Sequence, residues 1–168
     1  MTQTANMVSV RHDFQGGLTR AEIENMASNV NRAIADLKDY VNKWATAHGH
    51  PRDAGEVVVQ SSLELSLIVD LTNFDKHGGH GRNGGSSKLF PELKNLRRGL
   101  RITAGGAPGA MAMMQVLPTG AINTVGDAAV TVLGDVCLRD GRQIEMGYVQ
   151  QPAIEAWEEV FRQFGLPV

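Results

Sequence analysis

The chain has 168 residues, of which 42% are hydrophobic and 20% are charged, and its formal net charge is −2. That length suits one domain of ordinary size, and the composition is that of a folded globular protein, which excludes a disordered chain. The nearly neutral charge gives no global reason to expect nucleic acid. The single cysteine, Cys137, excludes an internal disulfide and is compatible with a reducing compartment.

The first residues, MTQTANMVSVRHDFQGG, contain no apolar core of signal-peptide type. No run in the chain approaches the roughly 18 apolar residues of a membrane span. We therefore expect a cytoplasmic protein with no membrane partner. Residues 1–18 otherwise show little pattern beyond a weak, strand-like alternation of Val8 and Val10.

A capping box opens the first predicted helix, because Thr19 can cap the first turn while Glu22 reaches back to the threonine N–H. Apolar residues then recur at three- and four-residue steps as far as Gly49, which predicts a long amphipathic helix. These residues are Ile23, Met26, Ala27, Val30, Ile34, Leu37, Tyr40, Val41 and Trp44.

A second helix is predicted from the cap at Asp53 to His77, and the short connection at 48–52 favours antiparallel packing of the two in a helical hairpin over 19–77. This helix is apolar almost all round. Its polar residues share a sector roughly 80° wide at ~100° per residue. They are Ser62, Ser66, Asp70, Asn73 and His77. We expect a buried helix whose polar seam faces a cleft or another chain. A homodimer would be the simplest way to bury the apolar surface of this helix.

The stretch after His77 is a glycine- and histidine-rich loop over 78–88, and Leu89–Arg101 is predicted to form a short helical turn after Pro91. Turn signals and short apolar runs then predict an antiparallel β-sheet over 100–149. Asp140-Gly141 predicts a two-residue hairpin in which Cys137 opposes Ile144 and points into the core. Pro152 is expected to open a closing helix over 152–164. The predicted fold class is a single α+β domain.

The best candidate site comprises Asp70, Asn73 and His77, which are spaced to lie along one face of a helix. A histidine close to a carboxylate can act as a general acid or base near neutral pH. The structural alternative is a polar seam that only fixes helix packing. Both interpretations remain open from the sequence.

The glycine-rich loop allows other chemistry. His77 and His80, with Asp75 or Asp70, have the donor types of a transition-metal site, whereas a flexible linker would carry the same histidines without a ligand. Residues 84–88, GGSSK, resemble a phosphate cradle but lack the spacing of a P-loop. We predict no metal and no cofactor.

A basic patch follows the loop. Its residues are Lys88, Lys94, Arg97, Arg98 and Arg101. They suit RNA or DNA phosphates, although no aromatic residue is interleaved among them for base stacking. The alternative is a solvated face that aids solubility. Trp44 and Trp157 are predicted to anchor the first and last helices in the core.

The run Ile68–His77, IVDLTNFDKH, resembles the D-x-x-N-x-x-K-H helix ending of uncharacterised bacterial families that are distantly similar to the HEPN superfamily of helical nucleotide-binding and ribonuclease domains. The segment VTVLGD…DG and the tryptophan-bearing terminal helix are similar to the same families. The resemblance covers about a third of the chain. It implies a metal-independent ribonuclease in which His77, with Asp70 and Asn73, helps to activate a ribose 2′-hydroxyl. Active HEPN ribonucleases place an arginine shortly before the histidine, and none lies between Asp53 and His77.

Two classes of function follow. The first is a non-enzymatic binding protein of a bacterial or phage system, in defence or counter-defence, with a homodimer or another protein as partner. The second is a HEPN-like, RNA-directed enzyme that uses His77. The missing arginine favours the first.

Overall fold

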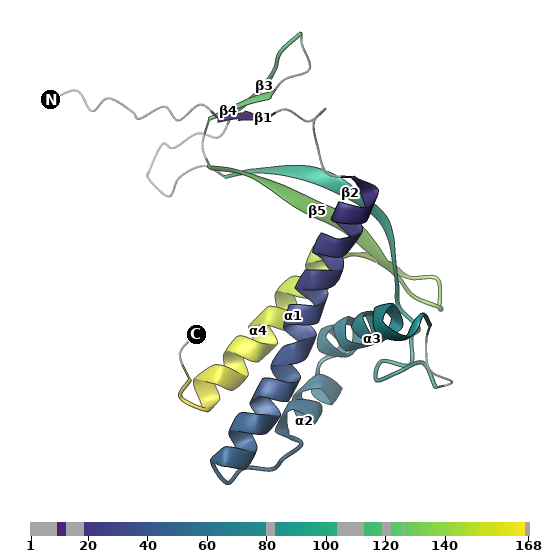
Figure 1. Ribbon diagram of the computed structural model, residues 1–168, viewed down its shortest axis with the longest axis vertical. Coiled ribbons are helices and arrows are strands. Elements are labelled where there is room, and N and C mark those ends of the chain that lie inside the picture. Colours follow the sequence, from purple (N-terminus) through teal and green to yellow (C-terminus); the bar gives the residue numbers. More distant parts are fainter. Residues whose placement is uncertain are drawn as a thin grey trace, which may run out of the picture. The chain divides into compact units, whose positions relative to one another are not determined.

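The computed structural model describes residues 10–12, 19–79, 83–103, 113–118, 122–125 and 127–166. It confirms the predicted α+β class (Figure 1). The helices are α1 (Arg20–Ala47), α2 (Ala54–Ser61), α3 (Leu63–His77) and α4 (Gly147–Gln163). The strands are β1 (Val10–His12), β2 (Glu92–Thr103), β3 (Met113–Val116), β4 (Ile122–Val125), β5 (Asp127–Cys137) and β6 (Gln143–Glu145).

Contacts divide the chain into two compact units where the sequence predicted one domain. The first contains Met1–Ile23 and Arg98–Val132, and the second contains Glu24–Arg97 and Leu133–Val168. The strands form two three-stranded sheets, ordered β1-β4-β3 and β2-β5-β6. β4 pairs antiparallel with both β1 and β3, so residue Thr124 lies opposite Val10 on one side and Met114 on the other.

The predicted capping box at the start of α1 is confirmed. The N–H of Thr19 donates to the carboxylate of Glu22 at 2.6 Å, and the N–H of Glu22 donates to the threonine hydroxyl at 3.3 Å. These bonds hold the pKa of Glu22 below its ordinary value. The helix start is therefore determined locally, by residues three apart.

The second arm of the predicted hairpin is two helices rather than one. Ser62 adopts an extended conformation (φ −118°, ψ 123°), and its hydroxyl accepts the N–H of Leu65 at 3.2 Å, which makes it the N-cap of α3. α2 and α3 are bent by 109° at this break. α2 packs tightly on α1 ahead of this break, since a Cβ at Gly55 of α2 would lie 2.5 Å from the carbonyl oxygen of Lys38.

No single helix among the described residues is long and apolar enough to cross a membrane. α2 and α3 have the length and apolar composition of a membrane span only when they are taken together, and the chain bends sharply between them. Every residue from Leu65 to Thr72 of α3 is buried, which confirms the predicted buried character of this segment.

The core of the second unit forms where α3 packs against α2 and α4. Trp157 of α4 is buried, and its indole N–H donates to the backbone carbonyl of Ile34 in α1 at 3.0 Å. The other large side chains that are fully buried include Leu65, Leu67, Ile68, Val41, Val136 and Val149. Burial of such side chains is worth roughly 1.5–3 kcal/mol each, so this cluster dominates the stability of the unit.

The hairpin between β5 and β6 differs from the prediction by one residue. Val136 pairs with Ile144 and Cys137 with Gln143, because the loop has three residues instead of two. Leu138 donates its N–H to the carbonyl of Arg142, and Gly141 takes a φ of +90° in the last loop position. A one-residue shift turns every side chain to the other face, so the prediction that Cys137 points into the core was wrong.

Two further local predictions were wrong. The segment predicted as a helical turn, Leu89–Arg101, lies mostly in strand β2, and the positive φ values of Phe90 and Asn95 are incompatible with a helix there. α4 begins at Gly147, so Pro152 lies inside the helix and not at its start. The helix does end where predicted, before Gly165 with its φ of +66°.

Candidate interaction surface

Asp70, the carboxylate of the predicted site, is enclosed in the protein. Its side chain is 2% exposed, and it accepts hydrogen bonds from the N–H groups of Ser86 and Ser87, both at 2.8 Å, and from the Ser87 hydroxyl at 2.6 Å. A Cβ at Gly85 would lie 2.0 Å from the carboxylate. Asp70 therefore anchors the glycine-rich loop to α3, and its role in this position is structural.

Asn73 and His77 are exposed on the last turns of α3. Within the part of the chain that the structure describes, no hydrogen bond joins either residue to Asp70. The structure thus separates one buried carboxylate from two exposed side chains. His80 and Arg82 lie outside the described residues, and the described part of the chain holds no group of three or more histidine, cysteine or acidic residues suited to a metal ion.

The predicted basic patch contributes two cations that are already paired. Lys94 lies 2.8 Å from the carboxylate of Glu92, which raises the pKa of the lysine. Arg97 lies 3.9 Å from Asp135. Lys88 is exposed, with a φ of +62°, and the side chain of Arg101 lies outside the described residues. Arg98 also interacts with a neighbouring group. Pairing of this kind reduces the attraction that a run of free cations would exert on phosphates.

Cys137 lines a shallow pocket of about 330 Å³ in the second unit, together with residues that the sequence did not connect with it. The guanidinium of Arg139 lies 4.7 Å from the ring centroid of Phe90 in the same place. The other lining residues are Glu92, Lys94 and Leu138. The thiol is only half-buried, so it is a surface group and not a core one.

A polar pocket of about 430 Å³, which sequence analysis missed, lies between α1, α3 and β2. The hydroxyl of Ser28 donates to the carboxylate of Asp75 at 2.6 Å, which ties α1 to the end of α3. The pocket is also lined by Glu24, Asn25, Arg32, Leu93 and Leu96. No sequence signal reveals this pocket, because its residues are separated by up to 72 positions in the chain, from Glu24 to Leu96, and carry no motif.

Among the described residues, α1 carries a stripe of apolar residues that the fold leaves partly uncovered. The buried residues of the helix occupy one sector, represented by Ala27, Ile34, Val41 and Ala45. At ~100° per residue a second apolar sector lies directly beside it. We call this second sector the α1 stripe; its members are Met26, Val30, Ala33, Leu37, Tyr40, Trp44 and Ala47.

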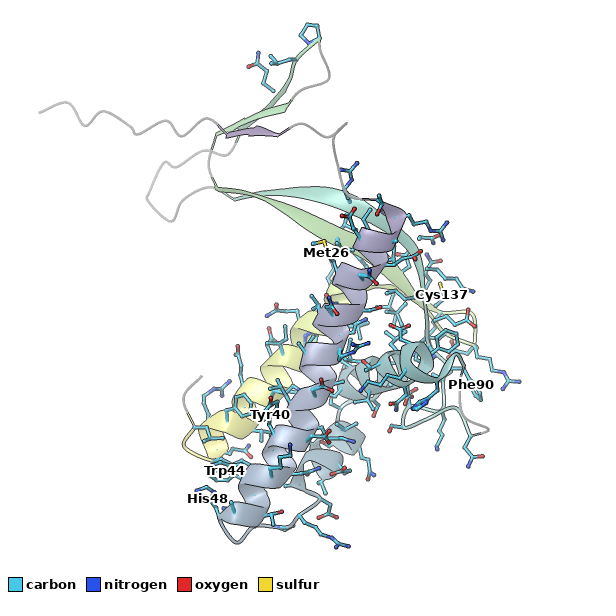
Figure 2. All side chains as sticks on the ribbon, viewed as in Figure 1. Met26, Tyr40, Trp44, His48, Phe90 and Cys137 are labelled. Atoms are coloured by element: carbon cyan, nitrogen blue, oxygen red, sulfur yellow. The ribbon has the colours of Figure 1, made fainter. Side chains whose placement is uncertain are left out.

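The α1 stripe reaches solvent along its whole length. Met26 is 40% exposed, Val30 46% and Tyr40 66%, while Leu37 and Trp44 are half-buried. Figure 2 shows Met26, Tyr40 and Trp44 following one another down the helix. Isolated exposed apolar residues are ordinary, but a continuous row of them is typical of an interaction surface.

Stacked aromatic rings lie at the C-terminal end of the α1 stripe. The ring of Trp44 lies 4.3 Å from that of His48, 5.5 Å from His50 and 4.7 Å from Phe164 after α4. His48 also contacts the carbonyl of Trp44 through Nδ1, at 2.9 Å. Trp44 thus contacts Phe164 after the last helix, and it is partly exposed, so the prediction of a buried anchor at Trp44 was wrong. The buried anchor is Trp157.

No protein-family model, no curated protein and no solved structure matches this chain.

Proposed function

We propose that this chain is a non-enzymatic binding protein that acts through contact with another protein chain. The observation that carries the proposal is the α1 stripe, because a folded protein gains nothing in stability from holding Met26, Val30 and Tyr40 in water. The resemblance of Ile68–His77 to bacterial helix families is the reason for proposing a bacterial or phage setting, in defence or counter-defence.

The RNA-directed alternative receives less support from the same coordinates. A general base needs an accessible position within hydrogen-bond reach of its substrate. Asp70 is buried and already accepts three hydrogen bonds, and His77 has no bond to it. A binding function needs no such arrangement and uses the exposed surface as it stands.

Photo-crosslinking in cells tests this proposal. A photoreactive amino acid is introduced at Val30 or Tyr40, both on the α1 stripe, and at Val57, which is 58% exposed on α2 and lies outside the stripe. We expect adducts of defined mass from the two stripe positions and none from Val57. Adducts at none of the positions, or equally at all three, would overturn the proposal. The adduct mass also tells a second copy of the chain from a different protein.

A further inference from the structure

We propose that the partner of the α1 stripe is the α1 stripe of a second copy of this chain, packed antiparallel about a two-fold axis near residue 35. This inference rests on the proposed binding function and specifies its partner. It starts from the spacing of the stripe. Successive members are separated by four, three, four, three, four and three residues, from Met26 to Ala47.

That spacing is the heptad repeat of a coiled-coil seam, sustained here over three repeats. Met26, Ala33, Tyr40 and Ala47 occupy one core position of the heptad, and Val30, Leu37 and Trp44 occupy the other. Such a repeat holds one line of residues against a partner helix along its full length. Helix α4 lies beside α1 (Figure 1) and uses a different face of it, since Trp157 reaches the backbone of Ile34. Within the described chain the seam consequently faces no partner helix, and Trp44 at its end contacts the rings of His48, His50 and Phe164.

The sizes of the side chains select the antiparallel direction. When the axis lies near residue 35, Ala33 meets Leu37 of the second copy, Val30 meets Tyr40, and Met26 meets Trp44. Each large side chain then faces a smaller or more flexible one, as close packing requires. A parallel pair would instead set Trp44 against Trp44 and Ala33 against Ala33, with crowding in one layer and a void in another.

The charges beside the seam permit this arrangement. No stripe member is charged, and the flanking positions on the side away from the buried sector are Asn29, Asp36 and Lys43. Asp36 lies close to the proposed axis and would meet its own copy there. Lys76 of α3 lies 3.7 Å from Asp36, so each carboxylate brings a neutralising ammonium group with it. In the antiparallel register Lys43 meets Asn29, a neutral partner.

The size of the seam indicates how tightly the copies bind. From Met26 to Ala47 the helix rises about 32 Å at 1.5 Å per residue, and a strip about 10 Å wide covers roughly 300 Å² on each chain. That footprint, about 600 Å² for the two chains together, is well below the roughly 1,200–2,000 Å² of stable specific interfaces, so the pairing is weak and reversible. We therefore expect an equilibrium between monomer and dimer that shifts with protein concentration.

The test is sedimentation equilibrium of the full chain with charges introduced at opposed positions. Val30→Glu and Tyr40→Lys should each weaken dimerisation at least about tenfold, because each buries an unpaired charge. The control Val57→Lys should leave it unchanged. An equimolar mixture of the two single variants, and the double variant Val30→Glu/Tyr40→Lys, should recover the dimer, because only the antiparallel register places position 30 opposite position 40.

Several outcomes would overturn the inference. Wild-type protein that stays monomeric at every concentration would exclude the second copy, and a variant pair that fails to recover the dimer would exclude the register. Circular dichroism and melting temperature show that each variant is folded, which the exposure of both positions leads us to expect. If the wild type is monomeric but Val30 and Tyr40 still crosslink to a different protein in cells, the binding function stands and only the proposed partner fails.

Discussion

The carboxylate of Asp70 accepts both the backbone N–H and the hydroxyl of Ser87, at 2.8 and 2.6 Å, from within the buried part of α3. A third hydrogen bond comes from the N–H of Ser86. Asp70 therefore connects the buried part of α3 to the glycine-rich loop. Charge-assisted hydrogen bonds of this kind are about twice as strong as neutral ones. One of the three residues of the predicted catalytic site is thus the residue that holds the loop in place.

The substitution Asp70→Asn should therefore destabilise the protein by about 1.5–3 kcal/mol, since the amide group cannot accept all three bonds and turns a donor toward donors. Urea unfolding measures the loss. The neighbouring change Asn73→Ala, at an exposed position, should stay within about 0.5 kcal/mol of wild type. Equal stability of the wild type and Asp70→Asn would contradict the anchoring role.

Gly85 provides a test of the same contact from the loop side. Gly85→Ala adds a Cβ 2.0 Å from Asp70 at a φ of +70°, whereas Gly49→Ala adds one at a φ of +77° with no atom within 4 Å. Both variants incur the cost of a left-handed residue, about 1–2 kcal/mol. We expect Gly85→Ala to lose at least about 1–3 kcal/mol more, from overpacking. Thermal unfolding of the two variants side by side measures the difference, and similar losses would show that the loop moves aside freely.

Ser62 is expected to stabilise the start of α3. Ser62→Ala removes the hydroxyl that accepts the N–H of Leu65, and the loss of an N-cap costs typically about 1 kcal/mol. Ser61→Ala is the matched control, because the Ser61 hydroxyl only donates to the carbonyl of Val58 on an exposed turn. Chemical denaturation should rank Ser62→Ala clearly below Ser61→Ala, and the reverse order would show that the Ser62 cap does not stabilise α3.

The stability of the second unit should depend on pH through Asp135. The side-chain amide of Asn95 donates to this carboxylate at 2.9 Å, and that bond, aided by Arg97, holds the pKa of Asp135 below its ordinary value. A pKa lowered in the folded state contributes stability that is present above the unfolded value, about 3.9, and is lost as the pH falls through the folded value. The advantage of wild type over Asp135→Asn should therefore be constant above about pH 5 and shrink below about pH 4.

A control for this pH effect lies on the opposite strand. Asn95 has a φ of +54°, which glycine tolerates, so Asn95→Gly removes the hydrogen bond with little backbone strain. Equilibrium unfolding at several pH values should show the same reduced acid dependence in Asn95→Gly as in Asp135→Asn. An acid dependence identical to that of the wild type in both variants would mean that the bond does not form in solution.

The RNA-directed alternative makes its own prediction. If binding is the function, purified protein should leave RNA intact, with or without added metal, and His77→Ala should behave as wild type. Gel analysis of labelled RNA measures this directly. RNA cleavage that disappears in His77→Ala at an unchanged melting temperature would instead favour the enzyme, because His77 is exposed and its removal should not disturb the core.

Local patterns in the sequence determined the features that depend on neighbouring residues. The capping box at Thr19, the long periodic helix behind it and the end of α3 at Gly78 all follow from residues within one or two turns of each other. The α+β class also followed from the sequence, because helical periods and turn signals occupy different parts of the chain.

Only the tertiary structure decided the features that depend on distant partners. The close approach of Gly55 in α2 to Lys38 in α1 depends on tertiary packing, and the role of Asp70 depends on a loop sixteen and seventeen residues further along the chain. The face of Cys137 depended on one additional loop residue in the hairpin. In α1 the apolar sector is wider than the surface its neighbours cover, and periodicity alone cannot say which part faces the core. Packing buried Ile34 and Val41 and left Val30 and Tyr40 in solvent.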